Sequence, residues 1–186
     1  MKVISTNIGK KTTLLWKGKE VQTGILKKAT NTPITLGIED VQGDAVIDRR
    51  YHGGVDQAVY AYGEQHYAYW QNLYPSIEMK PGFFGENLTI SNLDENTIYV
   101  GAIYELGTAI VQVTKPRQPC MKLGIIFGTQ QVLKQFWSVP KCGFYFKILK
   151  EGTVEKGAQL TLIESSKNSK SIAEVYTEKR KKKAIE

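Results

Sequence analysis

Residues 109–124 read AIVQVTKPRQPCMKLG. Apolar and polar residues alternate over Val111-Gln112-Val113-Thr114, a pattern typical of a strand with one buried face. The pattern ends at Pro116, because proline lacks the N–H group that a sheet needs. Short apolar stretches bounded by turn-forming residues recur along the chain as KVISTNI, AVID, AVYAY, NLTI, IYEL, GFYFKIL and QLTLIE. Many short strands separated by frequent turns predict a barrel or a sandwich.

Three segments have the apolar spacing of helices. Residues 64–73 show this spacing, and the segment ends before Pro75. Residues 129–137 have Thr129 as an N-cap, and residues 169–183 begin with serine caps and run into the basic stretch KRKKK. We therefore expect a mostly β fold with α (α+β), with a few peripheral helices and a C-terminal helix.

The chain has 186 residues, of which 41% are apolar, enough for one core and one domain. Two cysteines are too few for a disulfide framework or an iron–sulfur cluster, and two histidines disfavour a structural zinc site. Any redox chemistry would therefore need electrons from another protein or a bound organic cofactor. The first residues lack the apolar region of a signal peptide, and no apolar run approaches the length of a membrane span. Two free thiols suit a reducing cytosol, so we expect a cytoplasmic location.

The net charge of +7 is concentrated near the C-terminus. Residues 167–186 hold seven Lys or Arg against three Glu, a net of +4, which leaves +3 for residues 1–166. The tail is therefore where an electrostatic partner would act. The run KRKKK is short and lacks interleaved aromatic residues, which disfavours nucleic acid as that partner.

Cys120 lies between Pro119 and Met121, with Arg117 and Lys122 nearby. The two cations would favour the thiolate, which attacks electrophiles and binds soft metals. The proline restricts the backbone, so the loop has few ways to place the sulfur. An inert, buried cysteine near a strand end is the other interpretation, and the local sequence leaves both open. The second cysteine, in PKCGFYF, is expected in the core.

Two glycine-containing blocks are candidate binding loops. RRYHGGVDQAVYAY, residues 49–62, suits an anion cradle built from arginines and the flexible Gly53-Gly54, or else a hairpin with exposed arginines. PGFFGENLTI offers Phe83 and Phe84, which stack on a planar ring or else belong to the core. The motifs GxGxxG, GxxxxGK[ST] and the serine nucleophile elbow are absent, so common dinucleotide, P-loop and serine hydrolase sites lack support.

Five blocks in this order resemble the MOSC domain, the molybdenum cofactor sulfurase C-terminal type: TGILKK, GDAVIDRRYHGGVDQAVYAY, FGENLTI, VTKPRQPCMKLG and GFYFKILKEGTVEKGA. Their order and spacing are most similar to the stand-alone bacterial YiiM-like branch, from residue 2 to residue 164. The resemblance implies a curved β-barrel with a molybdenum–pterin cofactor in its cleft and Cys120 as the protein ligand to molybdenum. At the family level it also carries an association with pyridoxal phosphate.

The resemblance further implies a set of site residues. Candidates for binding the cofactor are Thr23, Lys27, Arg49, Arg50, His52, Gly53, Gly54, Asp56, Asn87 and Arg117, with Cys120 and His52 as catalytic residues. His66 and Tyr67 match a stretch near the cleft, or else form a helix face packed on the barrel. Many YiiM-like proteins continue into three helices where this chain has one helix and a basic end. We expect residues 1–165 to form the MOSC domain and residues 166–186 a C-terminal helix and basic tail.

The function that the resemblance implies is a molybdenum-dependent reductase of N-hydroxylated compounds such as hydroxylaminopurines or amidoximes, served by an external electron-donor reductase. Cys120 would hold the metal, and His52 or an ordered water would supply a proton. A carrier of molybdenum cofactor or of sulfur, without turnover of its own, is a second hypothesis. A Cys–His hydrolase that uses the same two side chains is a further alternative. A second copy of the chain is a candidate partner, and no membrane partner is expected.

Overall fold

The computed structural model describes residues 1–49, 51–166 and 168–183. Their regular secondary structure is mostly strand, with helices between and after the strands. The strands are β1 (Lys2–Gly9), β2 (Thr12–Trp16), β3 (Lys19–Thr23), β4 (Lys27–Ala29), β5 (Ile34–Leu36), β6 (Val59–Gly63), β7 (Leu88–Ser91), β8 (Ile103–Leu106), β9 (Ala109–Pro116), β10 (Phe144–Lys150), β11 (Gly152–Val154) and β12 (Leu160–Glu164). The helices are the 3-10 turn η1 (Val55–Gln57), α1 (His66–Leu73), α2 (Met121–Ile126), α3 (Gln131–Ser138) and α4 (Ile172–Lys183).

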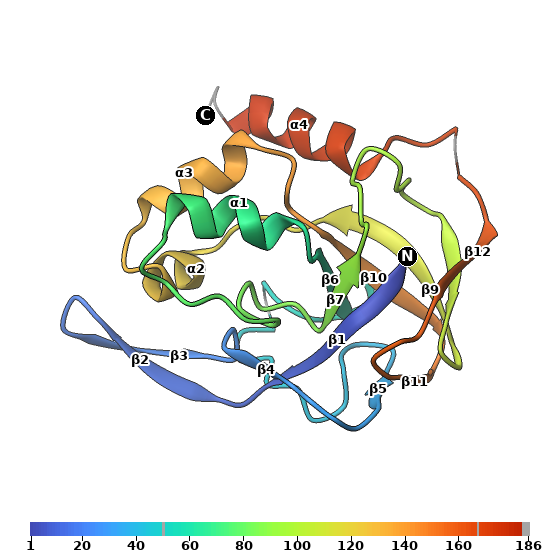
Figure 1. Cartoon of the computed structure of the whole chain (residues 1–186), viewed down its shortest axis with the longest axis horizontal. Coiled ribbons are helices and arrows are strands. Elements are labelled where there is room, and N and C mark those ends of the chain that lie inside the picture. The colour runs from blue at the N-terminus through green and yellow to red at the C-terminus, as the bar shows by residue number, and fades with distance from the viewer. Residues whose placement is uncertain (50, 167, 184–186) are drawn as a thin grey trace.

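Eight strands form one curved sheet in the order β12-β8-β9-β10-β6-β7-β1-β4 (Figure 1). Neighbouring strands are antiparallel except β6 and β7, which run parallel. Gln159, just before β12, makes a single antiparallel bridge to Lys2 in β1. The described sheet therefore curls back on itself without closing into the expected barrel, whereas the expected mostly β fold with α is confirmed.

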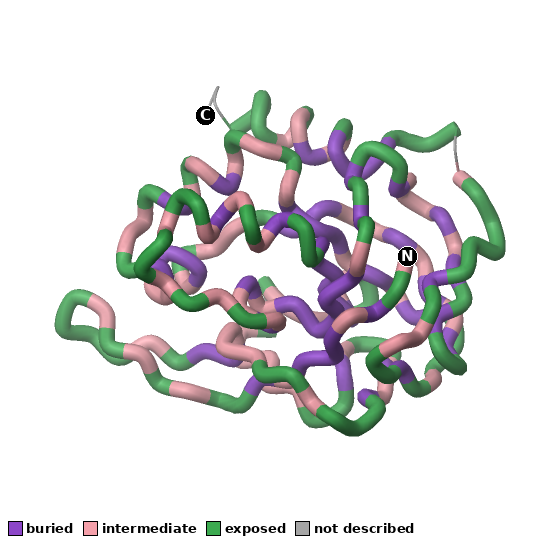
Figure 2. Tube along the Cα trace, viewed as in Figure 1, coloured by how far each residue is buried: buried purple, intermediate pink, exposed green. Residues whose placement is uncertain are grey.

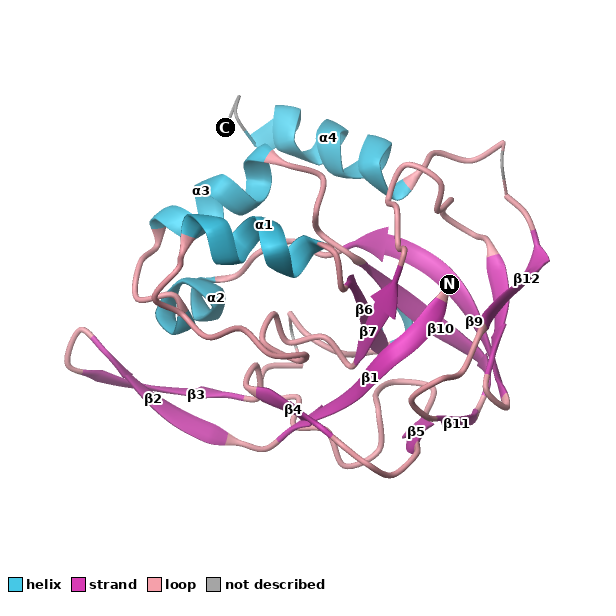
Figure 3. Cartoon of the chain, viewed as in Figure 1, coloured by secondary structure: helices cyan, strands magenta, loops and turns pink. Residues whose placement is uncertain are grey.

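Helices α1–α4 gather on one side of the molecule (Figure 3), and buried residues occur both on these helices and throughout the sheet (Figure 2). Trp70 of α1 stacks on Phe136 of α3, with ring centroids 5.3 Å apart. The Trp70 indole N–H donates to the Tyr62 hydroxyl in β6 at 2.7 Å, and Tyr62 contacts Phe84 at 4.6 Å between centroids. This aromatic cluster fixes α1 and α3 to β6. Another residue of β6, Tyr60, lines the candidate site described below.

Helix α4 begins with a capping box, as the serine-rich start predicted. The Glu174 N–H donates to Ser171 Oγ at 3.2 Å, and the Ser171 N–H donates to Glu174 Oε2 at 2.7 Å. Tyr176 stacks on Trp137 at 4.9 Å, which packs the helix on α3. Among the described residues, no helix is both long and apolar enough to cross a membrane.

One expected strand is absent from the structure, and one helix was not predicted. The stretch AVID, residues 45–48, is not a strand: the Ala45 N–H donates to the Gly9 carbonyl at 3.0 Å, and a Cβ on Gly24 would lie 1.8 Å from the Ala45 carbonyl oxygen. This close backbone packing replaces a regular ladder and forms one wall of the site. Helix α2 was not predicted, because six residues are too few to reveal a helical period.

Candidate functional site

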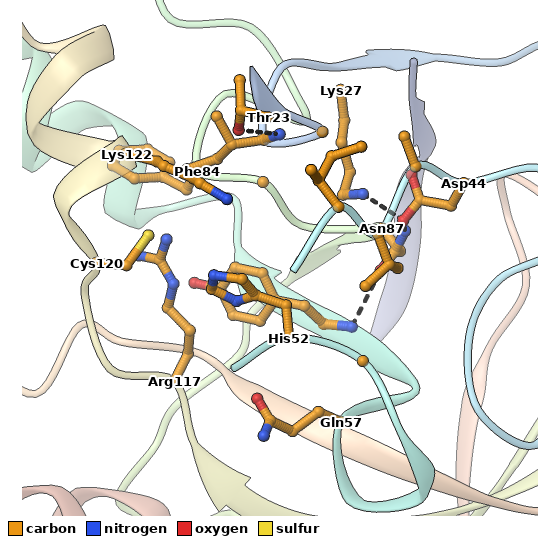
Figure 4. Close-up of a pocket in the computed structure, with 18 of the residues that line it drawn as sticks. Thr23, Lys27, Asp44, His52, Gln57, Phe84, Asn87, Arg117, Cys120 and Lys122 are labelled. Carbon is orange, nitrogen blue, oxygen red and sulfur yellow. Dashed lines mark hydrogen bonds and ion pairs between the residues drawn. The ribbon is translucent and has the colours of Figure 1, made fainter. Parts of the chain in front are cut away.

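One pocket brings together segments that are far apart in the sequence (Figure 4). It lies between the base of the β2–β3 hairpin, the loops before η1 and before β7, and the loop that joins β9 to α2. Its lining residues fall within the segments 23–27, 44–47, 52–60, 84–87 and 117–122, and Tyr145 completes the set. The five blocks that resemble the MOSC domain therefore meet at this pocket.

Cys120 lies where β9 has ended and α2 begins. Its backbone is extended (φ −117°, ψ 164°), and its carbonyl accepts the Leu123 N–H at 2.9 Å, which fixes the first turn of α2. Burial of the thiol opposes ionisation, but a hydrogen bond from His52 and the charge of Arg117 outweigh it and lower the pKa of Cys120 to about 6. Cys120 is therefore mainly a thiolate at neutral pH, and it remains partly exposed to the pocket.

Arg117 carries a buried charge beside this thiolate. It is 4% exposed, and its guanidinium lies 5.3 Å from the Tyr60 ring and 5.2 Å from the Phe136 ring. Burial acts to lower the pKa of Arg117, but Tyr60 and Cys120 outweigh it and raise the pKa above its usual value. No carboxylate in the described part of the chain pairs with it, and its Nη1 has no hydrogen-bond partner. A buried N–H group of this kind costs about 1–3 kcal/mol unless a ligand accepts it.

The opposite wall of the pocket holds a buried ion pair between Lys27 and Asp44 (Figure 4), whose side chains are 7% and 4% exposed. Asp44 also accepts hydrogen bonds from Asn87 Nδ2 at 2.9 Å and from the Gly9 N–H at 2.7 Å. Burial lowers the pKa of Lys27, and the interaction with Asp44 acts against that shift. An ammonium has three N–H donors, so Lys27 retains donors for a ligand while Asp44 holds its charge in place.

His52 and Gly53 bring the third side of the pocket into position. Gly53 has a left-handed backbone (φ 72°), and a Cβ there would lie 3.0 Å from Val46 Cγ1. This position therefore needs glycine, and the tight turn directs the His52 side chain toward Cys120. Gln57, which follows on η1, also faces the pocket (Figure 4).

Most of the predicted site residues line this pocket. They are Thr23, Lys27, His52, Gly53, Asn87, Arg117 and Cys120. Gly54 and Asp56 lie beside it and hold its loop: the Gly54 N–H donates to the Glu39 carbonyl at 2.9 Å, and Thr114 Oγ1 donates to the Asp56 carbonyl at 2.8 Å. The structure thus brings these residues together, and their binding roles stay predictions.

Arg49 lies outside the pocket. Its side chain is 54% exposed and pairs with Asp40 and Glu39, so it fastens two surface loops together. Arg50 lies outside the described residues.

His66 and Tyr67 do not line the pocket either. His66 Nε2 lies 2.9 Å from both carboxylate oxygens of Glu95, and the Tyr67 hydroxyl donates to Glu86. Both residues therefore pack α1 against neighbouring loops, in agreement with the packed helix face that was the alternative interpretation.

Several lining residues were missed by the sequence analysis, among them Asp44, Gln57, Tyr60 and Tyr145. Tyr60 and Tyr145 are paired in register across β6 and β10, with ring centroids 5.3 Å apart. Strand alternation shows which residues share a face but not which face meets a pocket. Asp44 lies within the recognised block GDAVIDRRYHGG, so a signal for it was present.

The donor set of the pocket is that of a site for an anionic ligand with a soft metal. A thiolate supplies one soft donor, whereas Arg117, Lys27 and Lys122 supply positive charge against the single carboxylate of Asp44 among the described lining residues. The unpaired Nη1 of Arg117 is a ready donor to an anion. These features fit a molybdenum–pterin cofactor, whose metal takes sulfur ligands and whose phosphate is negatively charged.

Comparison with known proteins identifies the family of the chain. The MOSC domain family matches residues 48–161. The chain is 40% identical over 161 residues to the uncharacterized protein YflK of Bacillus subtilis (strain 168). The aligned region covers 87% of this chain and 72% of YflK. The chain is also 31% identical over 150 residues to the protein "Reductase" of Gibberella moniliformis (strain M3125 / FGSC 7600). That aligned region covers 79% of this chain and 27% of the fungal protein. The crystal structure of YiiM from Geobacillus stearothermophilus matches with a TM-score of 0.80 at 35% identity, over 97% of this chain and 84% of that one.

Proposed function

Because this chain belongs to the MOSC domain family, we propose that it is a molybdenum-cofactor-binding oxidoreductase that reduces N-hydroxylated compounds to amines. Hydroxylaminopurines and amidoximes are the substrate class. In the reaction the N–O bond breaks, two electrons and two protons enter, and the amine and water leave. A reduced flavoprotein supplies the electrons. The fungal relative with the name "Reductase" supports this class of activity, over the 27% of its length that the chain matches.

The observation that carries the proposal is the buried guanidinium of Arg117, whose Nη1 has no hydrogen-bond partner, beside the thiolate of Cys120. A buried guanidinium with a free Nη1 is costly in an isolated protein, because the desolvated donor has no acceptor. An anionic ligand bound at the sulfur would remove that cost. The same ligand would reach Lys27 on the opposite wall (Figure 4).

Each side chain has a role in this proposal. Cys120 would be the ligand to molybdenum, and Lys27, Asn87 and Arg117 would hold the pterin and its phosphate. When bound, the cofactor supplies the two-electron chemistry that protein side chains lack. His52 would deliver a proton to the departing hydroxyl oxygen, since imidazole is the side chain best suited to proton transfer near neutral pH.

Reduction of benzamidoxime by the purified holoprotein, with a chemically reduced viologen dye as electron source, tests the proposal. We expect turnover by wild type and a loss of at least about 100-fold in Cys120→Ala. Cys142→Ala is the matched control, because Cys142 is the other cysteine, is 0% exposed and does not line the pocket. Full activity in Cys120→Ala would overturn the proposed role of the sulfur.

The hydrogen bond between His52 and Cys120 favours one further class, a Cys–His hydrolase. Labelling of Cys120 by an acyl-type probe in metal-free protein, lost in His52→Ala, would support that alternative. Tight retention of the cofactor without any amidoxime reduction would instead support a carrier module.

A further inference from the structure

The β2–β3 hairpin carries an apolar face that lies outside the hydrophobic core. It extends away from the body of the molecule (Figure 1), and its strands pair with Leu14 opposite Val21 and Trp16 opposite Lys19. Leu14, Trp16 and Val21 lie on one face and are half-buried, whereas Leu15 on the other face is 73% exposed. Among the described residues, the hydrophobic core includes none of these three side chains.

This face is continuous with the pocket wall. Thr23 pairs with Thr12 at the base of the hairpin, is 0% exposed and lines the pocket. Side chains two residues apart on a strand share a face, so Val21 points to the same side as Thr23. Two residues of strand span roughly 7 Å, which places the Leu14–Val21 pair about that far beyond Thr23.

The two parts of this surface differ in chemistry. The pocket itself mixes apolar lining with charged groups, with Cys120 and Arg117 at one side and Lys27 at the other (Figure 4). The hairpin face offers two aliphatic side chains and then the Trp16 ring, with the Lys17 ammonium 5.9 Å from the ring centroid. A ligand that matches both parts has a polar head and a flat or aliphatic body. Ligand sites are mostly apolar with a few placed polar groups, so an apolar surface outside the core beside these charged groups suits such a ligand.

We propose that the Leu14, Trp16 and Val21 face binds the apolar body of the N-hydroxylated substrate whose N–OH group lies in the pocket. This inference rests on the proposed function and narrows the substrate to compounds with an aromatic or long alkyl substituent. The hairpin face is continuous with the pocket through Thr23. A substituent that leaves the pocket past Thr23 therefore runs along this face, which is why we assign the face to the substrate. Aromatic bodies gain further from the indole ring of Trp16.

Binding of three amidoximes of increasing length tests the proposal: acetamidoxime, benzamidoxime and 4-phenylbenzamidoxime. Isothermal titration of the holoprotein without reductant measures affinity without turnover. Leu14→Ser should weaken binding of 4-phenylbenzamidoxime by about tenfold and change that of acetamidoxime by less than about twofold. Leu15→Ser is the matched control, with the same substitution on the opposite face, and should change neither. Val21→Thr keeps the side-chain shape and should reproduce the loss with less risk to the hairpin.

Equal affinities of the three amidoximes in wild type would overturn the proposal, as would equal effects of Leu14→Ser and Leu15→Ser. A dimer that Leu14→Ser converts to a monomer would show that a second copy of the chain covers this face, which also overturns it. Turnover with reductant separates the two claims. Leu14-dependent binding without reduction contradicts only the proposed function, and reduction with Leu14-independent binding contradicts only the apolar site.

Discussion

Replacing Arg117 with methionine should raise the pKa of Cys120 and slow its alkylation below neutral pH. Burial favours the neutral thiol, and three groups reverse that preference: His52 through a hydrogen bond, Arg117 through its charge and Leu123 through its backbone N–H. Methionine fills much of the volume between Tyr60 and Phe136 without supplying the charge. His52 and the Leu123 N–H would then remain to oppose burial.

The magnitude follows from the pKa of about 6 in the wild type. At pH 6 about half of Cys120 is thiolate, and at pH 7 about nine-tenths. If the loss of Arg117 raises the pKa of Cys120 by about one unit, roughly a tenth remains ionised at pH 6. The alkylation rate at pH 6 should then fall about fivefold, because the thiolate is the reactive form.

The assay is the rate of iodoacetamide modification of cofactor-free protein from pH 5 to 9, followed by mass spectrometry. Cys142 is an internal reference, because burial raises its pKa well above the usual value and it is 0% exposed. Lys122→Met is the matched control, since Lys122 also lines the pocket but is not among the groups that shift the pKa of Cys120. A wild-type midpoint above pH 8, or equal effects of the Arg117 and Lys122 substitutions, would refute the reasoning.

Other substitutions test the pocket wall and the fold, by urea unfolding. Lys27→Met should reduce the free energy of unfolding by about 3–5 kcal/mol because it leaves Asp44 charged and buried, and addition of Asp44→Leu should recover part of that loss. Gly143→Ala should cost at least about 3 kcal/mol, because φ is 62° and the new Cβ would lie 2.2 Å from the Ala61 carbonyl oxygen. Gly128→Ala has a similar φ of 70° but open space, so it should cost only about 1–2 kcal/mol, and equal losses at the two glycines would contradict the steric argument.

The strands could be predicted from the sequence because their apolar alternation is a local property. The run around Val111 and Val113 predicted β9, and the stretch FYFKIL predicted β10. The hairpin β2–β3 was not predicted, since apolar and polar residues do not alternate strictly in TTLLW or KEVQT. Its turn is visible in the structure as positive φ at Lys17 and Gly18, of 49° and 75°.

The site residues that belong to a chemical motif could be predicted from the sequence. Those that reach the pocket only through the packing of the strands could not. Cys120 and Arg117 lie within one recognised block, and both line the pocket. Arg49 belongs to a recognised block too, yet its nearest charges are the carboxylates of the neighbouring loop, which hold it at the surface. Tyr60 and Gln57 reach the pocket only because β6 and η1 pack against other strands, which no local pattern reports.

The central claim is that the Cys120 sulfur binds molybdenum, and elemental analysis tests it most directly. Wild type and Cys120→Ala would be expressed in a host that makes the cofactor, purified side by side, and analysed for molybdenum per chain. The account predicts about one molybdenum per wild-type chain and a loss of at least about tenfold in Cys120→Ala, with unchanged thermal unfolding of the metal-free proteins. Wild type without molybdenum, or equal contents in the two proteins, would contradict it.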